Sequence, residues 1–191
     1  RPSGFVVAAR EKEENIQIEG ISIRLVIDRI DALEGGGLLL LDYKTGRNND
    51  YKNWAEARIT EPQLPIYAAF VLGDDENEVA AVCYAQVKTG ENGFRGIACD
   101  EGLVDGAVPL NDAKARKYFP EADFPDWISL LKHWKNSIEA IARELKSGEA
   151  SIKFSDEKQL AYCEVLPLLR LPERQLQYER PELTSKLHVG S

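Results

Sequence analysis

The sequence predicts a mixed α/β (α+β) domain in which helices flank a central mixed β-sheet. Segments rich in aliphatic and β-branched residues alternate with helical patterns, in the order strand, strand, hairpin, helix, strand. The 191 residues are enough for one sizeable core, so we expect a single domain over 1–191 with a Pro- and charge-rich tail over 171–191. No apolar run approaches the roughly 20 residues of a membrane span, so no membrane partner is expected.

The N-terminal part of the chain is expected to consist of strands. Aliphatic residues predict short strands over Phe5–Ala9 and Ile16–Ile18, and the run Ile21–Leu33 predicts a longer one. Leu38–Lys44 is expected to pair with that longer strand in a hairpin, because Gly35–Gly37 supply the positive φ angles of a tight turn.

The central part of the chain predicts a loop, a helix and a second pair of strands. Residues 47–55 are polar and are expected to form a loop, whereas Glu61–Leu72 carries apolar residues at helical spacing. Val79–Val87 predicts a strand, and Gly93–Ala98 is expected to pair with it across a turn that contains glycine.

A long helix is predicted to begin at Phe124–Asp126 and to end at Gly148. Apolar residues recur along it in alternating steps of four and three, which is typical of a helix face packed on a core. His133 lies on the same helix and is interpreted as a histidine satisfied within the fold rather than a metal ligand. The predicted core stripe consists of Trp127, Leu131, Trp134, Ile138, Ile141 and Leu145.

Two carboxylates and an ammonium lie within the predicted hairpin. If the register is symmetric about Gly35, Asp28 lies opposite Asp42, and strand alternation places Lys44 on the same sheet face. Like charges at cross-strand distances of about 4.5–5.5 Å are destabilising, so a cation is expected between the two aspartates. Spacing alone leaves two interpretations open, a metal site or a structural ion pair of Asp28 with Arg29 or Lys44.

The chemistry of such a site would suit phosphodiester hydrolysis. Oxygen ligands with open positions for water and substrate favour Mg²⁺ or Mn²⁺. Lys44 lies two residues beyond Asp42, from where it could reach a scissile phosphate. Asp31 is expected on the opposite face in a structural role, whereas Gln63 and Tyr67 share one side of a helix. The two residues form a polar edge that faces the site, or Tyr67 is instead an amphipathic residue of the core.

The overall charge and the cysteines restrict the class of protein. A net charge of −8 argues against a general nucleic-acid binder, although an acidic average can coexist with a basic groove. Basic residues near the hairpin in sequence form either such a groove or a solvated surface: Arg24, Arg29, Lys44, Arg47, Lys52 and Arg58. Cys83, Cys99 and Cys163 are odd in number and far apart, which favours a reducing, cytoplasmic setting.

Three motifs resemble those of the PD-(D/E)XK nuclease superfamily, in particular RecB/AddB-type exonuclease domains. They are Ile27–Asp31, Asp42–Gly46 and Gln63–Tyr67, in the order and spacing of that family, and the resemblance covers about residues 5–90. It implies a restriction-endonuclease-like core built around a central mixed sheet.

The resemblance also implies roles for the residues of these motifs. Asp28 and Asp42 would ligate Mg²⁺ or Mn²⁺ together with the backbone carbonyl of Tyr43, and Lys44 would be the catalytic lysine. Gln63 and Tyr67 would line the site and help to position DNA. Glu11 would match an acidic residue of the strand before the first motif.

Two departures from the family pattern lead to further expectations. Members usually carry an upstream helix with a histidine that completes the metal shell, and only four residues precede Phe5, so we expect an N-terminally truncated fragment of a longer protein. Some relatives also bind an iron–sulfur cluster through C-terminal cysteines. The matching positions here are Leu160, Cys163 and Leu169 followed by Arg170, so no cluster is expected.

The resemblance therefore implies a metal-dependent deoxyribonuclease, exonuclease-like in action. Such a domain belongs to a DNA repair or recombination protein and works with a helicase-like chain or domain. Two alternatives stay open: a non-catalytic DNA- or partner-binding module with a degenerate nuclease fold, and a structural domain in which Asp28, Asp42 and Lys44 form an ion network.

Overall fold

A computed structural model of the chain describes residues 4–45, 50–72, 79–87 and 92–148. The chain divides into two compact units, 1–149 and 150–191, and the second lies outside the described residues. The predicted tail, the stretch from Leu160 to Arg170 and the basic residue Arg47 lie outside them as well. A single domain over 1–191 therefore stays a prediction.

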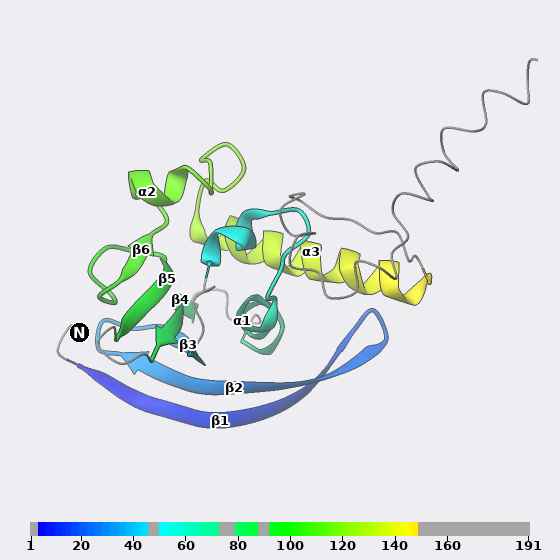
Figure 1. The fold of residues 1–191 in the computed structure, drawn as a ribbon, viewed down its shortest axis with the longest axis horizontal. Helices are drawn as coiled ribbons and strands as arrows, with labels where there is room; N and C mark the ends of the chain where they lie inside the picture. Colours follow the sequence, from blue (N-terminus) through cyan, green and yellow to red (C-terminus); the bar gives the residue numbers. More distant parts are fainter. Residues whose placement is uncertain (1–3, 46–49, 73–78, 88–91, 149–191) are drawn as a thin grey trace, which may run out of the picture. The chain divides into compact units, whose positions relative to one another are not determined.

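Within the described residues, six strands form one mixed sheet in the order of the sequence (Figure 1). Neighbouring strands are antiparallel from β1 to β3 and between β4 and β5, and parallel between β3 and β4 and between β5 and β6. The strands are β1 (Phe5–Ile18), β2 (Ile21–Leu33), β3 (Leu38–Lys44), β4 (Val79–Gln86), β5 (Gly93–Ala98) and β6 (Ala107–Pro109).

The parallel pair β3 and β4 requires a crossover connection, and the helices of the candidate site lie in it. The crossover carries the 3₁₀-helix η1 (Tyr51–Ala55), the α-helix α1 (Gln63–Ile66) and the π-helix η2 (Tyr67–Val71). Two further helices follow β6, α2 (Ala113–Arg116) and α3 (Trp127–Lys146). The architecture confirms the predicted mixed sheet flanked by helices.

The hairpin between β2 and β3 has the register predicted from symmetry about Gly35. Arg29 pairs with Leu41, and the pairing continues step by step to Ala32 with Leu38. Gly36 and Gly37 adopt φ angles of 92° and 81°, which are accessible to glycine at little cost. Continued by one step, this register sets Asp28 opposite Asp42.

Other expectations about the first strands and loops were wrong. The two short strands predicted before residue 19 are a single strand, β1, which pairs with β2 along its length apart from a bulge between Val7 and Ala9. Ladder pairing outweighs the low strand propensity of the charged residues in its middle. The loop predicted over 47–55 contains η1, whose Trp54 is fully buried, and β6 and α2 had no predicted counterpart.

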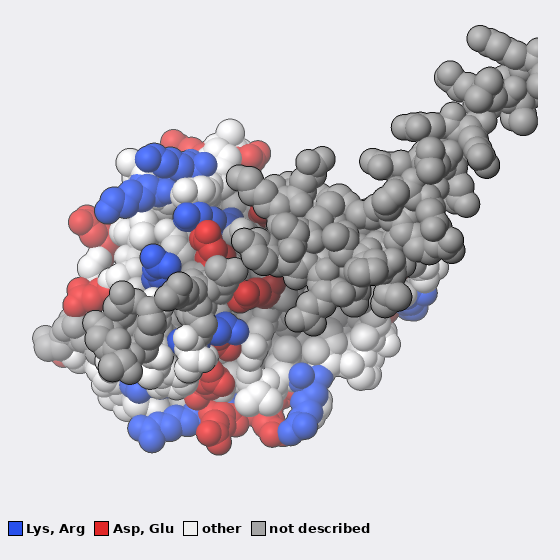
Figure 2. All heavy atoms as spheres, in the orientation of Figure 1, with Lys and Arg blue, Asp and Glu red and all other residues white. Residues whose placement is uncertain are grey.

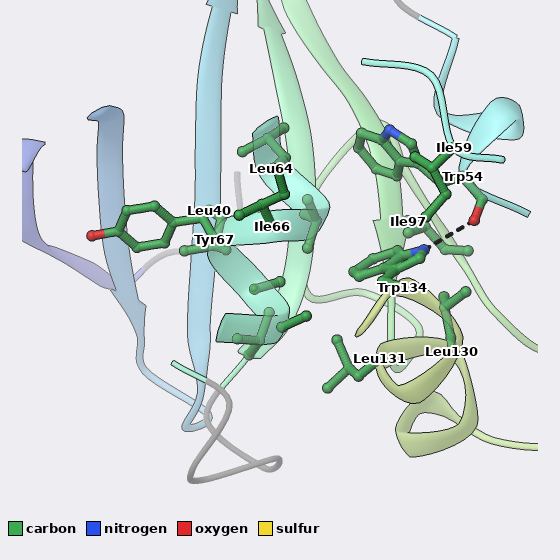
Figure 3. Close-up of a cluster of buried hydrophobic side chains, with 14 of the residues drawn as sticks. Leu40, Trp54, Ile59, Leu64, Ile66, Tyr67, Ile97, Leu130, Leu131 and Trp134 are labelled. Carbon is green, nitrogen blue, oxygen red and sulfur yellow. Dashed lines mark hydrogen bonds between the residues drawn. The ribbon is translucent and has the colours of Figure 1, made fainter. Parts of the chain in front are cut away.

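Both faces of the sheet carry an apolar core. The larger core lies on the face that includes Leu40, which we call the helix face because α1, η2 and α3 pack on it (Figures 1 and 3). Trp54 and Trp134 lie edge to face with ring centroids 5.7 Å apart, and Trp134 Nε1 donates to the Trp54 carbonyl at 3.0 Å. These contacts join η1 to α3. A smaller core, which includes Leu39 and Leu41, covers the opposite face.

The long helix was predicted nearly at its observed bounds. Asp126 caps α3 by accepting a hydrogen bond from the Ser129 backbone N–H at 2.7 Å. Trp134 and Ile138 are buried as expected, but Leu145 is 63% exposed and lies outside the core. The apolar stripe therefore ends one turn before the helix does.

Candidate active site

The C-terminal end of β3 places two polar side chains on the helix face of the sheet. Leu40 belongs to the helix-face core, so alternation along β3 points Asp42 and Lys44 to the same face. Both residues line a cavity of about 210 Å³ whose other walls are Glu61, Pro62, Gln63 and Tyr84. The crossover before α1 and the paired strand β4 therefore meet the end of β3 at this cavity.

Asp42 is a buried carboxylate, only 5% exposed. Its Oδ2 lies 3.0 Å from Lys44 Nζ. Burial raises the pKa of Asp42 most, the Lys44 ammonium lowers it, and the negative charges of Asp28 and Glu61 raise it further. The net effect is a raised pKa, because burial and the neighbouring carboxylates together outweigh the Lys44 ammonium.

Asp28 reaches from β2 to the backbone of β3. Its Oδ2 accepts a hydrogen bond from the Tyr43 backbone N–H at 2.7 Å. Because its charge also raises the pKa of Asp42, the two carboxylates lie within electrostatic range of each other. The structure thus brings Asp28, Asp42 and Lys44 together.

The ion pairs differ from those considered for Asp28. Arg29 pairs with Asp31 at 2.6 Å rather than with Asp28, and Asp31 is 1% exposed. Because Asp31 pairs with Leu39, whose side chain belongs to the smaller core, this ion pair lies on the face opposite the helix face. That placement agrees with the structural role predicted for Asp31.

Gln63 and Tyr67 lie one α-helical turn apart, as predicted, because the Tyr67 backbone N–H donates to the Gln63 carbonyl. Gln63 lines the cavity and its Nε2 donates to the Val26 carbonyl at 2.7 Å. Tyr67 is fully buried in the larger core, where burial raises its pKa to about 12, and its hydroxyl points away from the two tryptophans (Figure 3). The π-helical turn η2 begins at Tyr67 and follows this α-helical turn. Of the two interpretations of Tyr67, the core position is the one observed.

Tyr43 and Glu11 border the two aspartates through the backbone. The Tyr43 side chain is 47% exposed and lies on the face opposite Asp42, so only its main chain borders the site. The register of β1 and β2 places Glu11 across from Asp28, and Glu11 has a left-handed φ of 46°. Left-handed backbone is uncommon for a glutamate and marks a local distortion of β1 beside Asp28.

Sequence reasoning missed two residues of the site, Glu61 and Tyr84. Tyr84 is 2% exposed, and its hydroxyl donates to Glu61 Oε2 at 3.4 Å. Lys44 Nζ lies 5.6 Å from the centroid of the Tyr84 ring. Burial, together with the charges of Glu61 and Asp42, raises the pKa of Tyr84. Strand alternation could have placed Tyr84 on this face of the sheet, because it follows the apolar Val82 by two residues on β4. Glu61 lies in a turn that no sequence pattern marks.

The donor set suits a hard divalent cation. Asp42 Oδ2 is buried and receives no well-aligned hydrogen bond from the described residues, so its contact is the Lys44 ammonium. Within the described part of the chain, no three His, Cys, Asp or Glu side chains form a ready-made metal site. A cation bound here would have Asp28, Asp42 and the Tyr43 carbonyl as its protein ligands and water for the rest, as magnesium sites often do.

His133 has the structural role predicted for it, and Cys83 is a core residue. His133 Nε2 lies 3.1 Å from the Glu56 carbonyl, and its ring lies edge-on to Phe124. Burial lowers the pKa of His133. Cys83 is fully buried in the smaller core, and burial raises the pKa of its thiol. Cys99 is only partly buried.

The basic residues expected near the hairpin are largely neutralised by acidic partners. Arg24 pairs with Glu13 at 2.6 Å, and Lys52 pairs with Asp50 at 3.5 Å. Arg58 pairs with Glu144. On the face seen in Figure 2, basic side chains gather over α2, and elsewhere both signs are interspersed. The solvated-surface interpretation therefore fits these residues better than a continuous basic groove.

Comparison with known proteins gives one finding. A family model described as PD-(D/E)XK nuclease superfamily matches residues 2–168. The search of curated proteins returns no significant match. In the described residues, no helix has the length and apolar character needed to cross a membrane.

Proposed function

The chain belongs to the PD-(D/E)XK nuclease superfamily, and from that membership we propose that it hydrolyses DNA phosphodiester bonds with Mg²⁺ or Mn²⁺. The observation that carries the proposal is the juxtaposition of Asp28 and Asp42 beside Lys44 at the end of β3. A buried carboxylate with a raised pKa, next to a second carboxylate, is typical of a functional site.

In this proposal each residue has a distinct task. Asp28, Asp42 and the Tyr43 carbonyl hold the cation, which when bound supplies Lewis-acid stabilisation of the phosphoryl charge and a more acidic water. Lys44 presents its ammonium in the cavity, where it stabilises negative charge on the scissile phosphate. Gln63, fixed by the Val26 carbonyl, forms the wall of the cavity on the α1 side. Tyr67 supports this wall from within the core.

The finer features of the proposal follow the RecB/AddB resemblance of the three motifs. They are exonuclease-like action, a role in DNA repair or recombination, and a helicase-like chain or domain as partner. A cytoplasmic setting follows from the cysteine usage.

Isothermal titration with Mn²⁺ tests the metal site. We expect wild type to bind Mn²⁺ and Asp42→Ala to bind it at least about tenfold more weakly. Mutation of even an outer-shell partner of a metal ligand typically lowers the affinity that much. Asp50→Ala is a matched control, since Asp50 pairs with Lys52 two residues on, as Asp42 does with Lys44. Equal affinities for wild type and Asp42→Ala would refute the metal site.

Cleavage of linear and circular DNA, single- and double-stranded, in Mn²⁺ tests the reaction. Wild type should degrade linear DNA, Lys44→Ala should be inactive, and Lys52→Ala should retain activity. Degradation of linear but not circular DNA supports exonuclease action. A wild type that binds Mn²⁺ and DNA without cleaving either form would instead support the non-catalytic binding module.

A further inference from the structure

We propose that Tyr84, tethered by Glu61, is a positioning residue that fixes the ammonium of Lys44 in the cavity. The inference rests on the proposed function, because it assigns to Lys44 the task described above. It adds two residues that lie outside the three motifs and act through the lysine rather than on the substrate.

Lys44 would otherwise be poorly fixed. A lysine side chain has a flexible four-carbon stem and a point charge that can adopt many positions. Here Nζ lies 3.0 Å from Asp42 Oδ2 and 5.6 Å from the Tyr84 ring centroid. Asp42 and Tyr84 are direct partners in the register of β3 and β4. The lysine is therefore held from two sides by residues whose separation is set by the sheet.

The Tyr84 ring is itself fixed in place. It is 2% exposed and packs against Trp54, with ring centroids 5.2 Å apart. Trp54 is in turn packed edge to face on Trp134 of α3. A desolvated ring face attracts a cation more strongly than an exposed one. The core thus presents a rigid aromatic face to Lys44.

Glu61 secures the far end of Tyr84 from a strained backbone. Its Oε2 accepts the Tyr84 hydroxyl at 3.4 Å, and its φ is 50°. Left-handed backbone is unfavourable for glutamate and persists where the surrounding structure imposes it, often at functional sites. The conformation directs the carboxylate to the cavity that Lys44 also lines. We therefore assign Glu61 to holding Tyr84.

The position of Lys44 can be measured without any nuclease assay. We would record NMR spectra of the metal-free full chain labelled with carbon-13 lysine, and assign Lys44 by its loss in Lys44→Arg. A methylene next to an aromatic face shows an upfield ring-current shift. Wild type and Tyr84→Phe should show this shift, and Tyr84→Leu should lose it. Lys52, which lies 4.7 Å from the Tyr118 ring, is an internal reference that only Tyr118→Leu should change.

Activity in Mn²⁺ then tests the consequence. We expect Tyr84→Leu to lower kcat about tenfold, the effect of removing a desolvated cation–π contact, with Mn²⁺ affinity unchanged. Tyr84→Phe keeps the ring but loses the hydrogen bond to Glu61, so its kcat should lie between those of wild type and Tyr84→Leu. Phe119→Leu removes an equally buried aromatic residue outside the site, and should leave kcat unchanged. Glu61→Gln keeps an acceptor for the Tyr84 hydroxyl and should retain most of kcat and full Mn²⁺ affinity.

Each outcome decides the proposal. A Lys44 methylene at an ordinary shift in wild type, or one unchanged in folded Tyr84→Leu, would overturn it, as would a Tyr84→Phe variant as impaired as Tyr84→Leu. Loss of Mn²⁺ affinity in Glu61→Gln as large as in Asp42→Ala would assign Glu61 to the metal instead. Ring-current shifts as expected in a wild type without nuclease activity would support the positioning pair and refute the proposed reaction.

Discussion

Asp42 destabilises the metal-free fold while serving the proposed metal site. Its carboxylate is buried at 5% exposure, and burial together with Asp28 and Glu61 raises its pKa despite the Lys44 ammonium. A raised pKa means that folding favours the protonated form of this carboxyl. A divalent cation would reverse that preference, because it interacts with the ionised form alone. Asp42 should therefore make both the stability of the metal-free protein and its affinity for metal depend on pH.

Asp42→Asn should stabilise the metal-free protein at neutral pH. Since the folded pKa is raised, the contribution of Asp42 to stability is present below its unfolded pKa and is lost as pH rises through the folded pKa. Asparagine does not ionise, so the difference in Tm between Asp42→Asn and wild type should grow from acid to neutral pH. Calorimetry in EDTA measures it, and Asp50→Asn is the exposed control. A difference that shrinks as pH rises would contradict the argument.

Mn²⁺ binding should weaken on acidification at a higher pH than for an ordinary aspartate. Asp42 must lose its proton to ligate a metal, and its pKa is raised by burial and by its acidic neighbours. We expect the affinity measured by titration calorimetry to begin falling, as pH is lowered, at a higher pH than an unperturbed aspartate would give. Proton release on binding, obtained from buffers of different ionisation enthalpy, should rise as the affinity falls. Affinity that begins to fall only at the pH of an ordinary aspartate would contradict the raised pKa.

At the scale of elements, the sequence predicted those strands whose residues and turn glycines form a clear local pattern. The glycines of the β2–β3 turn fix the hairpin, and symmetry about Gly35 gave its register. β1 was divided in two because its charged middle has low strand propensity, whereas pairing with β2 keeps the strand continuous. η1 was missed because its one buried residue, Trp54, lies in a polar segment and packs against α3, which is distant in sequence.

The candidate site shows the same division between local and tertiary information. Asp28, Asp42 and Lys44 could be predicted because one hairpin carries all three. Glu61 depends on a left-handed turn, and Tyr84 depends on the parallel pairing of β3 with β4, which sequence order alone does not give. The i, i+4 spacing of Gln63 and Tyr67 gave their shared side of a helix, but not that the core packs around Tyr67.

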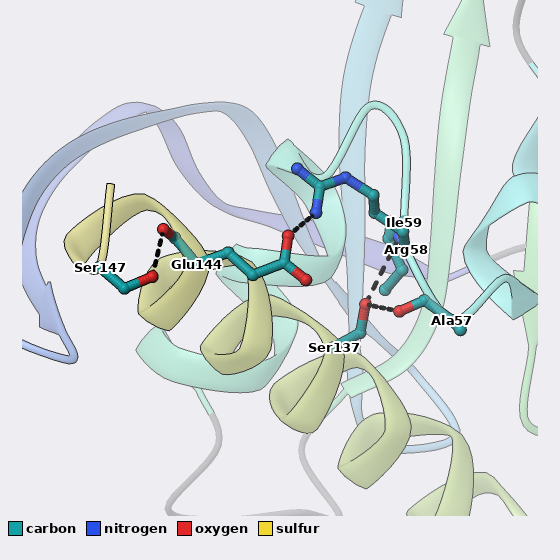
Figure 4. A network of polar contacts seen from close by, with 6 residues as sticks. All are labelled: Ala57, Arg58, Ile59, Ser137, Glu144 and Ser147. Atoms are coloured by element: carbon teal, nitrogen blue, oxygen red, sulfur yellow. Dashed lines mark hydrogen bonds and ion pairs between the residues drawn. The ribbon is translucent and has the colours of Figure 1, made fainter. Parts of the chain in front are cut away.

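The loop before α1 is joined to α3 by a serine, and this contact predicts a stability difference (Figure 4). Ser137 is buried; its hydroxyl donates to the Ala57 carbonyl at 2.8 Å and accepts from the Ile59 N–H at 3.4 Å. Ser137→Ala leaves both backbone groups without this partner and should cost about 1–3 kcal/mol in urea unfolding. Ser147→Ala, on the exposed end of α3, should cost much less. Equal losses would contradict the role of burial.

At the scale of the whole described unit, the sheet aligns residues from several strands on the helix face. Asp42 pairs with Tyr84, and Tyr84 pairs with Arg95 on β5. Paired residues share a face, and Ile97, two residues beyond Arg95, belongs to the helix-face core. Arg95 is exposed, and its Cα lies two strand spacings, roughly 10 Å, from that of Asp42. On a protein with a net charge of −8, such a cation has a strong local effect on DNA.

We therefore expect Arg95 to bind a phosphate next to the scissile one. Arg95→Ala should raise KM about tenfold with kcat nearly unchanged, because it removes a contact made equally in the ground state and the transition state. The slope of log affinity against log salt should fall by about one, the loss of a single phosphate contact. Arg95→Lys should restore the slope, since a lysine also neutralises a phosphate. Binding measured in Ca²⁺ separates affinity from turnover, and Arg24→Ala, whose guanidinium pairs with Glu13, is the matched arginine control. An unchanged salt slope in Arg95→Ala would place the DNA on another part of the molecule.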